Sequence, residues 1–195
     1  MIVGYELENH HRQSIRLKEY DYKLPGGYFV TIISHRRACL YGEIENGEIN
    51  LSQIGQMVEA CWYSIPNKSN NIELDEFILM PNHLHGIVLI YEAPGKGEAF
   101  SGMNTSQSVL NSENASPLQP RGKQSGSLSA VVQNFKSVST RRVNQKYFKS
   151  GNKIWQRSFY ERIIRNEREL KAIRQYILDN PLNWEMDKEK PANRS

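Results

Sequence analysis

The stretch from Ile72 to Tyr91, IELDEFILMPNHLHGIVLIY, decides how this chain folds. It contains two runs rich in apolar and β-branched residues, Ile72 to Met80 and His83 to Tyr91, which have the length and composition typical of strands. Pro81 and Asn82 separate the runs, and so short a connection brings two strands side by side in opposite directions. The sequence therefore predicts an antiparallel hairpin over these residues.

The rest of the chain places further strands and helices around this hairpin. Upstream, Tyr28 to Ser34 is another β-branched and aromatic run, and apolar residues recur at helical spacing over Ser52 to Tyr63. Downstream, helical spacing returns over Leu128 to Tyr147, Trp155 to Ile164 has extended character, and a last helix runs from Asn166 to about Asp179. This order predicts an α+β sandwich, an antiparallel sheet with helices mainly on one face.

One segment lacks these patterns. The 195 residues are enough for a single domain, residues 1–195, with a proper core. Within it, Glu92 to Ser127 is rich in Gly, Ser, Asn, Pro and Gln, with Phe100 as its only aromatic residue. Such a composition buries too little apolar surface to fix a structure, so we interpret residues 92–127 as a flexible loop or insertion.

The composition also excludes several classes of protein. The longest apolar stretches, such as Gly86 to Tyr91, are far shorter than the roughly 20 residues that span a bilayer. The N-terminal residues include acids and no apolar core, which is unlike a secretory signal. Cys39 and Cys61 lie far apart and outside any C-x-x-C pattern, which favours neither a disulfide scaffold nor a zinc knuckle. We therefore expect a protein of the reducing cytoplasm.

Positive charge is concentrated in one block of the sequence. Residues Arg121 to Arg174 carry 14 of the 25 Lys and Arg residues but 3 of the 21 Asp and Glu residues, a net +11 against −7 elsewhere. A solvated helix face is one interpretation, but a polyanion would relieve the self-repulsion, and the interleaved aromatic residues offer surfaces for stacking bases. Nucleic acid is the expected partner. The candidate contacts are the basic residues Arg12, Arg16, Lys136, Arg141, Arg142, Arg157 and Arg165.

His83 and His85 are the first candidates for chemistry. Alternate side chains of a strand share a face, so these two imidazoles can converge on one metal ion or one phosphate. Alone, the motif fits two unrelated polar residues at a strand end equally well. The other histidines, His10, His11 and His35, show no spacing that completes an all-histidine zinc site.

Tyr176 is the second candidate, in the last helix. Leu170, Ile173 and Ile177 form the apolar stripe of that helix. Tyr176 and Asn180 project about 40° apart at the edge of the stripe, on neighbouring turns. On this pattern alone, a half-buried structural tyrosine with a wet hydroxyl is the more common case.

Taken together, these motifs resemble a known family. NHLHG at residues 82–86, the basic block, WQRSFYERIIR at 155–165 and YILDNP at 176–181 resemble the tyrosine transposases with a His-hydrophobic-His motif. RQSIRLKEYDYKLPGGYFVTI at 12–32 and ELDEFILMPNHLHG at 73–86 are similar to the REP-associated subgroup of that family. The resemblance spans nearly the whole chain apart from residues 92–127 and the C-terminal end.

This resemblance implies a fold, an activity and a site. The family fold is a ferredoxin-like α+β sandwich, and the activity is that of a single-stranded DNA endonuclease and strand transferase that cleaves at hairpin-associated sites. His83 and His85 correspond to the ligands of a divalent cation, Mg²⁺ or Mn²⁺, and Asn180 to a third, polar ligand. Tyr176 corresponds to the nucleophile that forms a 5′-phosphotyrosine. The implied partner is single-stranded or hairpin DNA, bound by a monomer or a homodimer.

Three other functions are compatible with parts of the sequence. A non-catalytic nucleic-acid-binding protein on the same fold would explain the basic block but would leave His83 and His85 without a role. A metal-dependent nuclease that uses water as its nucleophile would make Tyr176 structural. A replication initiator or relaxase would use the same combination of paired histidines and a tyrosine, but the chain is short for such a protein and has no P-loop. Metal-dependent cleavage and a covalent protein–DNA adduct separate these alternatives.

Overall fold

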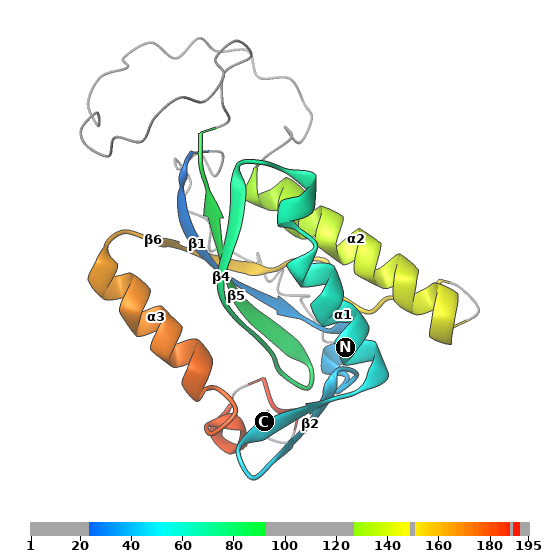
Figure 1. Ribbon diagram of the computed structural model, residues 1–195. Coiled ribbons are helices and arrows are strands. Elements are labelled where there is room, and N and C mark those ends of the chain that lie inside the picture. Colours follow the sequence, from blue (N-terminus) through cyan, green and yellow to red (C-terminus); the bar gives the residue numbers. More distant parts are fainter. Residues whose placement is uncertain (1–23, 93–126, 149–150, 188, 192–195) are drawn as a thin grey trace, which may run out of the picture.

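A four-stranded antiparallel sheet forms the centre of the protein (Figure 1). The computed structural model describes residues 24–92, 127–148, 151–187 and 189–191. The strand order is β4-β5-β1-β6, and every neighbouring pair is antiparallel. The strands are β1 (Gly26–Ile33), β4 (Ile72–Leu79), β5 (His83–Ile90) and β6 (Tyr160–Ile164).

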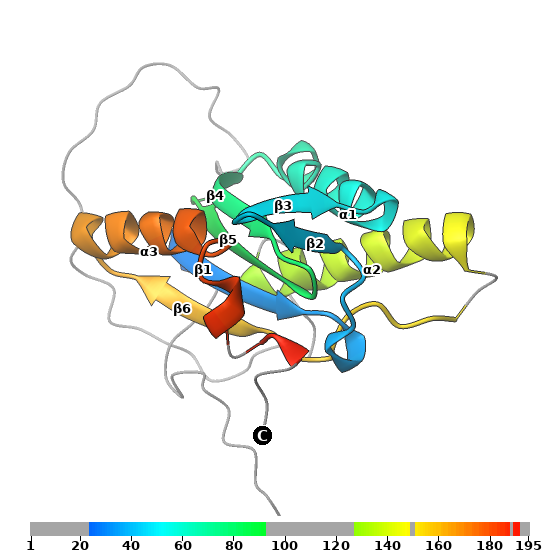
Figure 2. The same ribbon diagram turned by 90° about the horizontal axis from the view of Figure 1, so that it is seen from below.

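Helices cover both faces of this sheet. Two of them, α1 and α2, lie on one face, and α3 lies alone on the other (Figures 1 and 2). Each begins at a cap, Ser52, Ser127 or Asn166, whose side-chain oxygen accepts a main-chain N–H three residues on. The helices are α1 (Gln53–Tyr63), α2 (Leu128–Tyr147) and α3 (Glu167–Asp179).

The connections interleave two β-α-β units. β1 and β4 are joined through α1 and run in the same direction with β5 between them, and β5 and β6 are joined through α2 with β1 between them. This split arrangement is the ferredoxin-like topology. The predicted order of elements and the α+β sandwich are confirmed, and within the described ranges α3 is the one α-helix on the second face.

Several short elements were not predicted. Strands β2 (Gly42–Glu45) and β3 (Glu48–Leu51) form a small separate hairpin. Asn46 and Gly47 between them have φ values of 52° and 79°, as a two-residue turn of type I′ requires. Four residues are the shortest run over which apolar alternation indicates a strand, so the signal here is weak. The short 3₁₀ turns are His35–Arg37, Pro66–Lys68 and Trp184–Met186.

β5 contributes alternate side chains to two cores of unequal size. Leu84, Val88 and Ile90 join the larger cluster with the residues of α1 and α2. Ile87 points the other way and packs against buried residues of α3. The period of two in a strand therefore divides β5 between a large apolar core and the face that α3 covers.

Parts of the predictions fall on residues outside the structural description. Most of the predicted loop, residues 93–126, lies there, as do Arg12 and Arg16. The ends of that segment are placed: Glu92 follows β5, and Ser127 caps α2. Among the described residues, no helix combines the length and the apolar character that crossing a membrane requires.

Candidate active site

Four predicted site residues meet between β5 and α3. His83 and His85 point from β5 toward the face that α3 covers, and their Nε2 atoms lie 3.1 Å apart. The Tyr176 hydroxyl oxygen is 3.4 Å from His85 Nε2. Asn180 follows Tyr176 by one helical turn and is 4% exposed. The alternation of a strand and the periodicity of a helix thus bring together residues that are about ninety positions apart in the chain.

The hydrogen bonds of Asn82 determine which nitrogen of His83 carries a proton. The Asn82 amide nitrogen donates to the main-chain oxygens of Glu189, at 2.7 Å, and Arg37, at 3.3 Å. The amide oxygen therefore faces His83 Nδ1, 2.8 Å away, and can only accept. His83 Nδ1 must carry the hydrogen, which leaves the lone pair of Nε2 directed into the site.

His83 is neutral over most of the pH range. Its side chain is fully buried, and burial lowers its pKa from 6.5 to about 4. The Asp187 carboxylate, with Oδ2 3.6 Å from His83 Nε2, acts in the opposite direction, while Arg37 reinforces the effect of burial on the pKa. A neutral imidazole is the form that binds a cation.

β1 holds His85 in place. Thr31 lies opposite His85 in the β1–β5 register, and its hydroxyl is 2.8 Å from His85 Nδ1. The Phe29 ring stacks on the imidazole at a centroid distance of 5.3 Å. Two Nε2 lone pairs 3.1 Å apart would repel each other, so a proton or a cation must lie between His83 and His85.

Tyr176 combines a packed ring with an accessible hydroxyl. Its ring contacts Phe29 and His85 edge-on, at centroid distances of 6.0 and 5.2 Å, yet half of the side chain is exposed. Burial raises the pKa of its phenol, an effect that contact with the Asn180 side chain opposes in part. Tyr176 is therefore protonated at neutral pH and open to solvent on one side.

The Asn180 side chain places an amide oxygen close to the two imidazoles. Its backbone stays helical, with φ −59° and ψ −42°, although Pro181 disfavours that geometry. Its Oδ1 is buried and makes no hydrogen bond of good geometry among the described residues, although the side chain lies close enough to His83 to raise the pKa of that imidazole. Since an orphaned buried amide oxygen is costly, it is typical of a site that takes a ligand.

The donor set fits a divalent cation. The described residues contain no group of three or more His, Cys, Asp or Glu side chains able to hold a metal ion. The set is instead two imidazole nitrogens, of His83 and His85, and the amide oxygen of Asn180. Nitrogen and amide oxygen donors suit divalent first-row ions, and amide or carboxylate oxygens suit Mg²⁺ and Mn²⁺.

An ion pair fixes α3 against the sheet. Arg174 Nε and Nη2 donate to the two carboxylate oxygens of Asp75, at 2.9 and 2.5 Å. Asp75 lies where the β4–β5 register shifts, at a bulge that turns this side chain toward α3. Ile173 and Ile177 pack beside this pair against Ile87. The helix that carries Tyr176 is thereby held by a planar, two-pronged contact.

The predicted DNA-binding residues do not share one surface. Lys136, Arg141 and Arg157 line a groove of about 920 Å³ between α2 and residues 153–159. Arg142 points toward α1 instead, where its Nη1 lies 3.6 Å from the Cys61 sulfur. Arg165 lies at the turn before α3, where its main-chain N–H donates to Glu169. Arg12 and Arg16 are outside the described residues.

Other residues of the site were not predicted. Asn82 directly precedes His83 in the NHLHG motif, so its position in the sequence could have indicated that it belongs to the site. Thr31 and Phe29 reach the site only through the pairing of β1 with β5, which no local pattern reveals. Asp187 arrives from beyond α3, where the chain folds back toward His83.

The sequence matches known proteins over two ranges. Residues 121–180 match the family model of the IS200-like transposases, which spans α2, β6 and α3 and includes Tyr176 and Asn180. An uncharacterised protein of Haemophilus influenzae is 38% identical over 189 residues, which cover 96% of this chain and 97% of that protein.

The fold also matches a solved structure. A REP-associated tyrosine transposase bound to a REP hairpin superposes with a TM-score of 0.54 at 20% identity, over 87% of this chain and 74% of that one. At this identity the likeness concerns the fold, and it agrees with the ferredoxin-like sandwich described above. With the family match over the helix that carries Tyr176, the chain belongs to the IS200-like transposase family.

Proposed function

We propose that this protein nicks and rejoins single-stranded DNA at hairpin-associated sites, with Tyr176 as nucleophile. The observation that carries the proposal is the placement of an accessible phenol 3.4 Å from His85 Nε2, next to a buried amide oxygen without a partner. A structural tyrosine at a stripe edge would not need two buried imidazoles at its hydroxyl.

A divalent cation, Mg²⁺ or Mn²⁺, would be held by His83, His85 and Asn180. When bound, it would polarise the scissile phosphate and stabilise the charge that builds on the phosphate oxygens. Two features of the chain support this assignment: the neutral state of His83 and the orphaned Oδ1 of Asn180. Asn82 and Thr31 would orient the two imidazoles through their Nδ1 atoms.

Tyr176 would perform the covalent step. Its oxygen attacks phosphorus, a new P–O bond forms to the tyrosine, and the bond to the 3′ oxygen breaks. The products are a 5′-phosphotyrosine and a free 3′-hydroxyl. Because His85 Nε2 is a cation ligand in this proposal, the half-exposed phenol releases its proton to solvent, and the leaving 3′ oxygen takes up a proton from solvent.

Rejoining is the reverse exchange. A 3′-hydroxyl attacks the phosphotyrosine and releases Tyr176, so the energy of the phosphodiester bond is kept and no nucleotide cofactor is needed. All the proposed site residues come from one chain, so the proposal needs no second subunit. The relative solved with a REP hairpin supports hairpin DNA as the partner.

The test is incubation with single-stranded hairpin oligonucleotides and Mn²⁺, followed by a search for protein–DNA adducts. His83→Ala and His85→Ala should abolish cleavage and leave DNA binding largely intact, because neither side chain lines the basic groove. Cleavage without an adduct would favour a nuclease that uses water. Binding without cleavage under any metal would favour a non-catalytic nucleic-acid-binding protein.

A further inference from the structure

We propose that the groove between α2 and residues 153–159 holds single-stranded DNA, which crosses the β6 edge of the sheet to reach Tyr176. The proposal rests on the proposed function for its DNA substrate. It adds a binding site on the face of the sheet opposite the histidines, and a route between the two faces.

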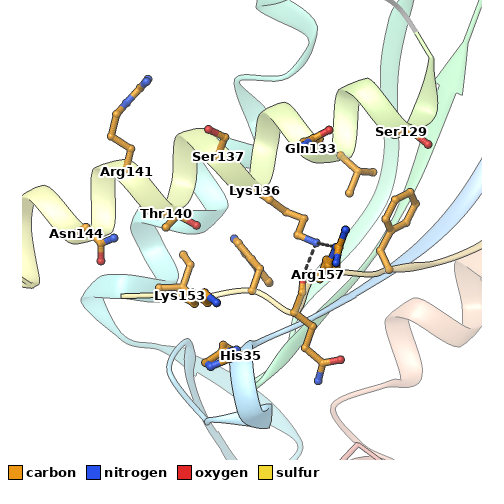
Figure 3. Close-up of a pocket in the computed structure, with 15 residues that line it drawn as sticks. His35, Ser129, Gln133, Lys136, Ser137, Thr140, Arg141, Asn144, Lys153 and Arg157 are labelled. Atoms are coloured by element: carbon orange, nitrogen blue, oxygen red, sulfur yellow. Dashed lines mark hydrogen bonds between the residues drawn. The ribbon is translucent and has the colours of Figure 1, made fainter. Parts of the chain in front are cut away.

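The lining of the groove suits a phosphate backbone. Its volume is about 920 Å³, and no acidic side chain of the described residues lines it. Lys136 reaches into it from α2, and Lys153 and Arg157 line it from the extended segment (Figure 3). Arg141 also lines it, with its side chain directed away from that segment, and neutral hydrogen-bonding groups lie along α2 (Figure 3). The residues that matter most are Lys136, Arg141, Lys153, Arg157, Gln133 and Asn144. Such a mixture offers both phosphate contacts and partners for base edges.

The walls of the groove are fixed in position. Lys136 Nζ extends from α2 and donates to the main-chain oxygens of Gln156, at 2.5 Å, and Arg157, at 3.0 Å (Figure 3). The carbonyl acceptors are neutral, so this contact joins the two walls without cancelling the charge of the lysine. Farther along, Asn144 Nδ2 donates to the oxygen of Asn152 at 3.0 Å. The groove is therefore built before any ligand arrives, which lowers the entropic cost of binding.

The shape of the groove favours a single strand over a duplex. A duplex is read by protein elements that enter its grooves, because its phosphates lie on a wide convex surface. A channel between a helix and an extended segment admits one strand, whose unpaired bases can stack and hydrogen bond. Phe159 lines the channel and offers a stacking surface, and Gln133 offers an amide.

The end of the groove leads to the catalytic face. Phe159, which lines the groove, is followed by Tyr160, the first residue of β6, and β6 is at the edge of the sheet formed by the described residues. Thr31 pairs with Tyr160 on one side and with His85 on the other, so these three side chains form a row across the sheet. Tyr160 is 40% exposed. A strand that leaves the groove at Phe159 passes Tyr160 and arrives at His85.

A matched pair of charge reversals tests the groove. Arg141 and Arg142 are neighbours on α2, but only Arg141 lines the groove, while Arg142 points toward α1. Binding of a fluorescent oligothymidine is measured against salt, without metal, in a Tyr176→Phe background. Arg141→Glu or Arg157→Glu should lower affinity and reduce the slope of log affinity against log salt by about 0.7 for each lost phosphate contact. Arg142→Glu should leave both nearly unchanged.

The route is tested by photo-crosslinking. A hairpin with a single-stranded tail that carries halogenated uracils should crosslink to Phe159 or Tyr160, and a closed hairpin without a tail should not compete for the groove. Equal effects of Arg141→Glu and Arg142→Glu would overturn the proposal. So would competition by the tailless hairpin as strong as that by the tailed one. Binding is measured without cleavage. These results would therefore test the groove even if Tyr176 proved not to be the nucleophile.

Discussion

The two faces of the main sheet differ in composition: one carries most of the apolar core, and the other carries the candidate site residues. The face under α1 and α2 is filled by large apolar side chains, including Trp62, which is fully buried against Phe77 and Phe135. The face under α3 has a small apolar cluster around Ile87 and two buried imidazoles beside it. A fold can afford buried polar groups on one face because the other supplies most of the apolar burial.

β5 shows how one strand serves both faces. Gly86 directly follows His85 and faces Trp62, where an added Cβ would come within 2.5 Å of the indole ring. The lack of a side chain at this position admits Trp62 directly behind the face that carries His83 and His85. The sharpest test of the comparison is therefore to weaken each face in turn.

The largest effect is expected from Trp62→Ala. It removes the centre of the larger core and should cost about 3–5 kcal/mol of the free energy of unfolding. Ile173→Ala is the truncation on the α3 face and should cost less, because it removes fewer atoms from a residue that is 8% exposed and lies in the smaller cluster. Urea denaturation of both variants measures the difference. A greater loss with Ile173→Ala would reverse the assignment of the two faces.

A second effect comes from His83 and depends on pH. Its pKa is about 4 in the folded protein and 6.5 when unfolded, so the unfolded chain takes up the proton first as the pH falls. The free energy of unfolding should therefore fall as the pH decreases from 6.5 to 4. Between pH 7 and pH 5 the loss should be about 2 kcal/mol. Denaturation curves of the wild type and of His83→Gln measure it. Equal pH dependence of the two proteins above pH 5 would contradict the buried neutral state.

A smaller effect on stability, with a larger one on activity, is expected from Asp75→Asn. This change weakens the contact with Arg174 that holds α3 at its angle, so Tyr176 should be misplaced and cleavage slowed by about ten- to a hundredfold. Lys171→Gln is the control on the same helix, since its pair with Glu167 is exposed and long at 3.9 Å. Equal cleavage rates in the two variants would show that the Asp75 contact does not position the nucleophile.

The smallest effect on stability is expected from Tyr176→Phe. The change removes one oxygen from a half-exposed side chain and keeps the ring contacts with Phe29 and His85, so the free energy of unfolding should change by less than about 0.5 kcal/mol. Thermal denaturation of the variant measures this. A large destabilisation would mean that the Tyr176 hydroxyl has a structural role.

Local periodicity explains which parts of this account the sequence could predict. The period of two placed His83 and His85 on one face, and the period of 3.6 placed Asn180 a turn after Tyr176. Neither period indicates which face of the sheet a helix covers. The position of α3 depends on long-range contacts such as Asp75 with Arg174, which lie 99 residues apart.

The basic residues show the same limit. Their number and their concentration in one block were visible, but not their directions in space. Lys136 bonds to main-chain oxygens of the facing segment while it lines the groove, and Arg142 lies on another side of α2, where it contacts Cys61. Thr31 carries no local signal, because it reaches His85 only through the strand register.

The central claim is that Tyr176 becomes covalently joined to DNA. The direct measurement is peptide mapping by mass spectrometry of an adduct formed with hairpin DNA and Mn²⁺. Tyr160 is the competing residue, because it is exposed and lies in the same row of side chains as His85. The account predicts a nucleotide on the peptide that contains Tyr176 and no adduct with Tyr176→Phe. A nucleotide on Tyr160, or an adduct with the Tyr176→Phe protein, would contradict it.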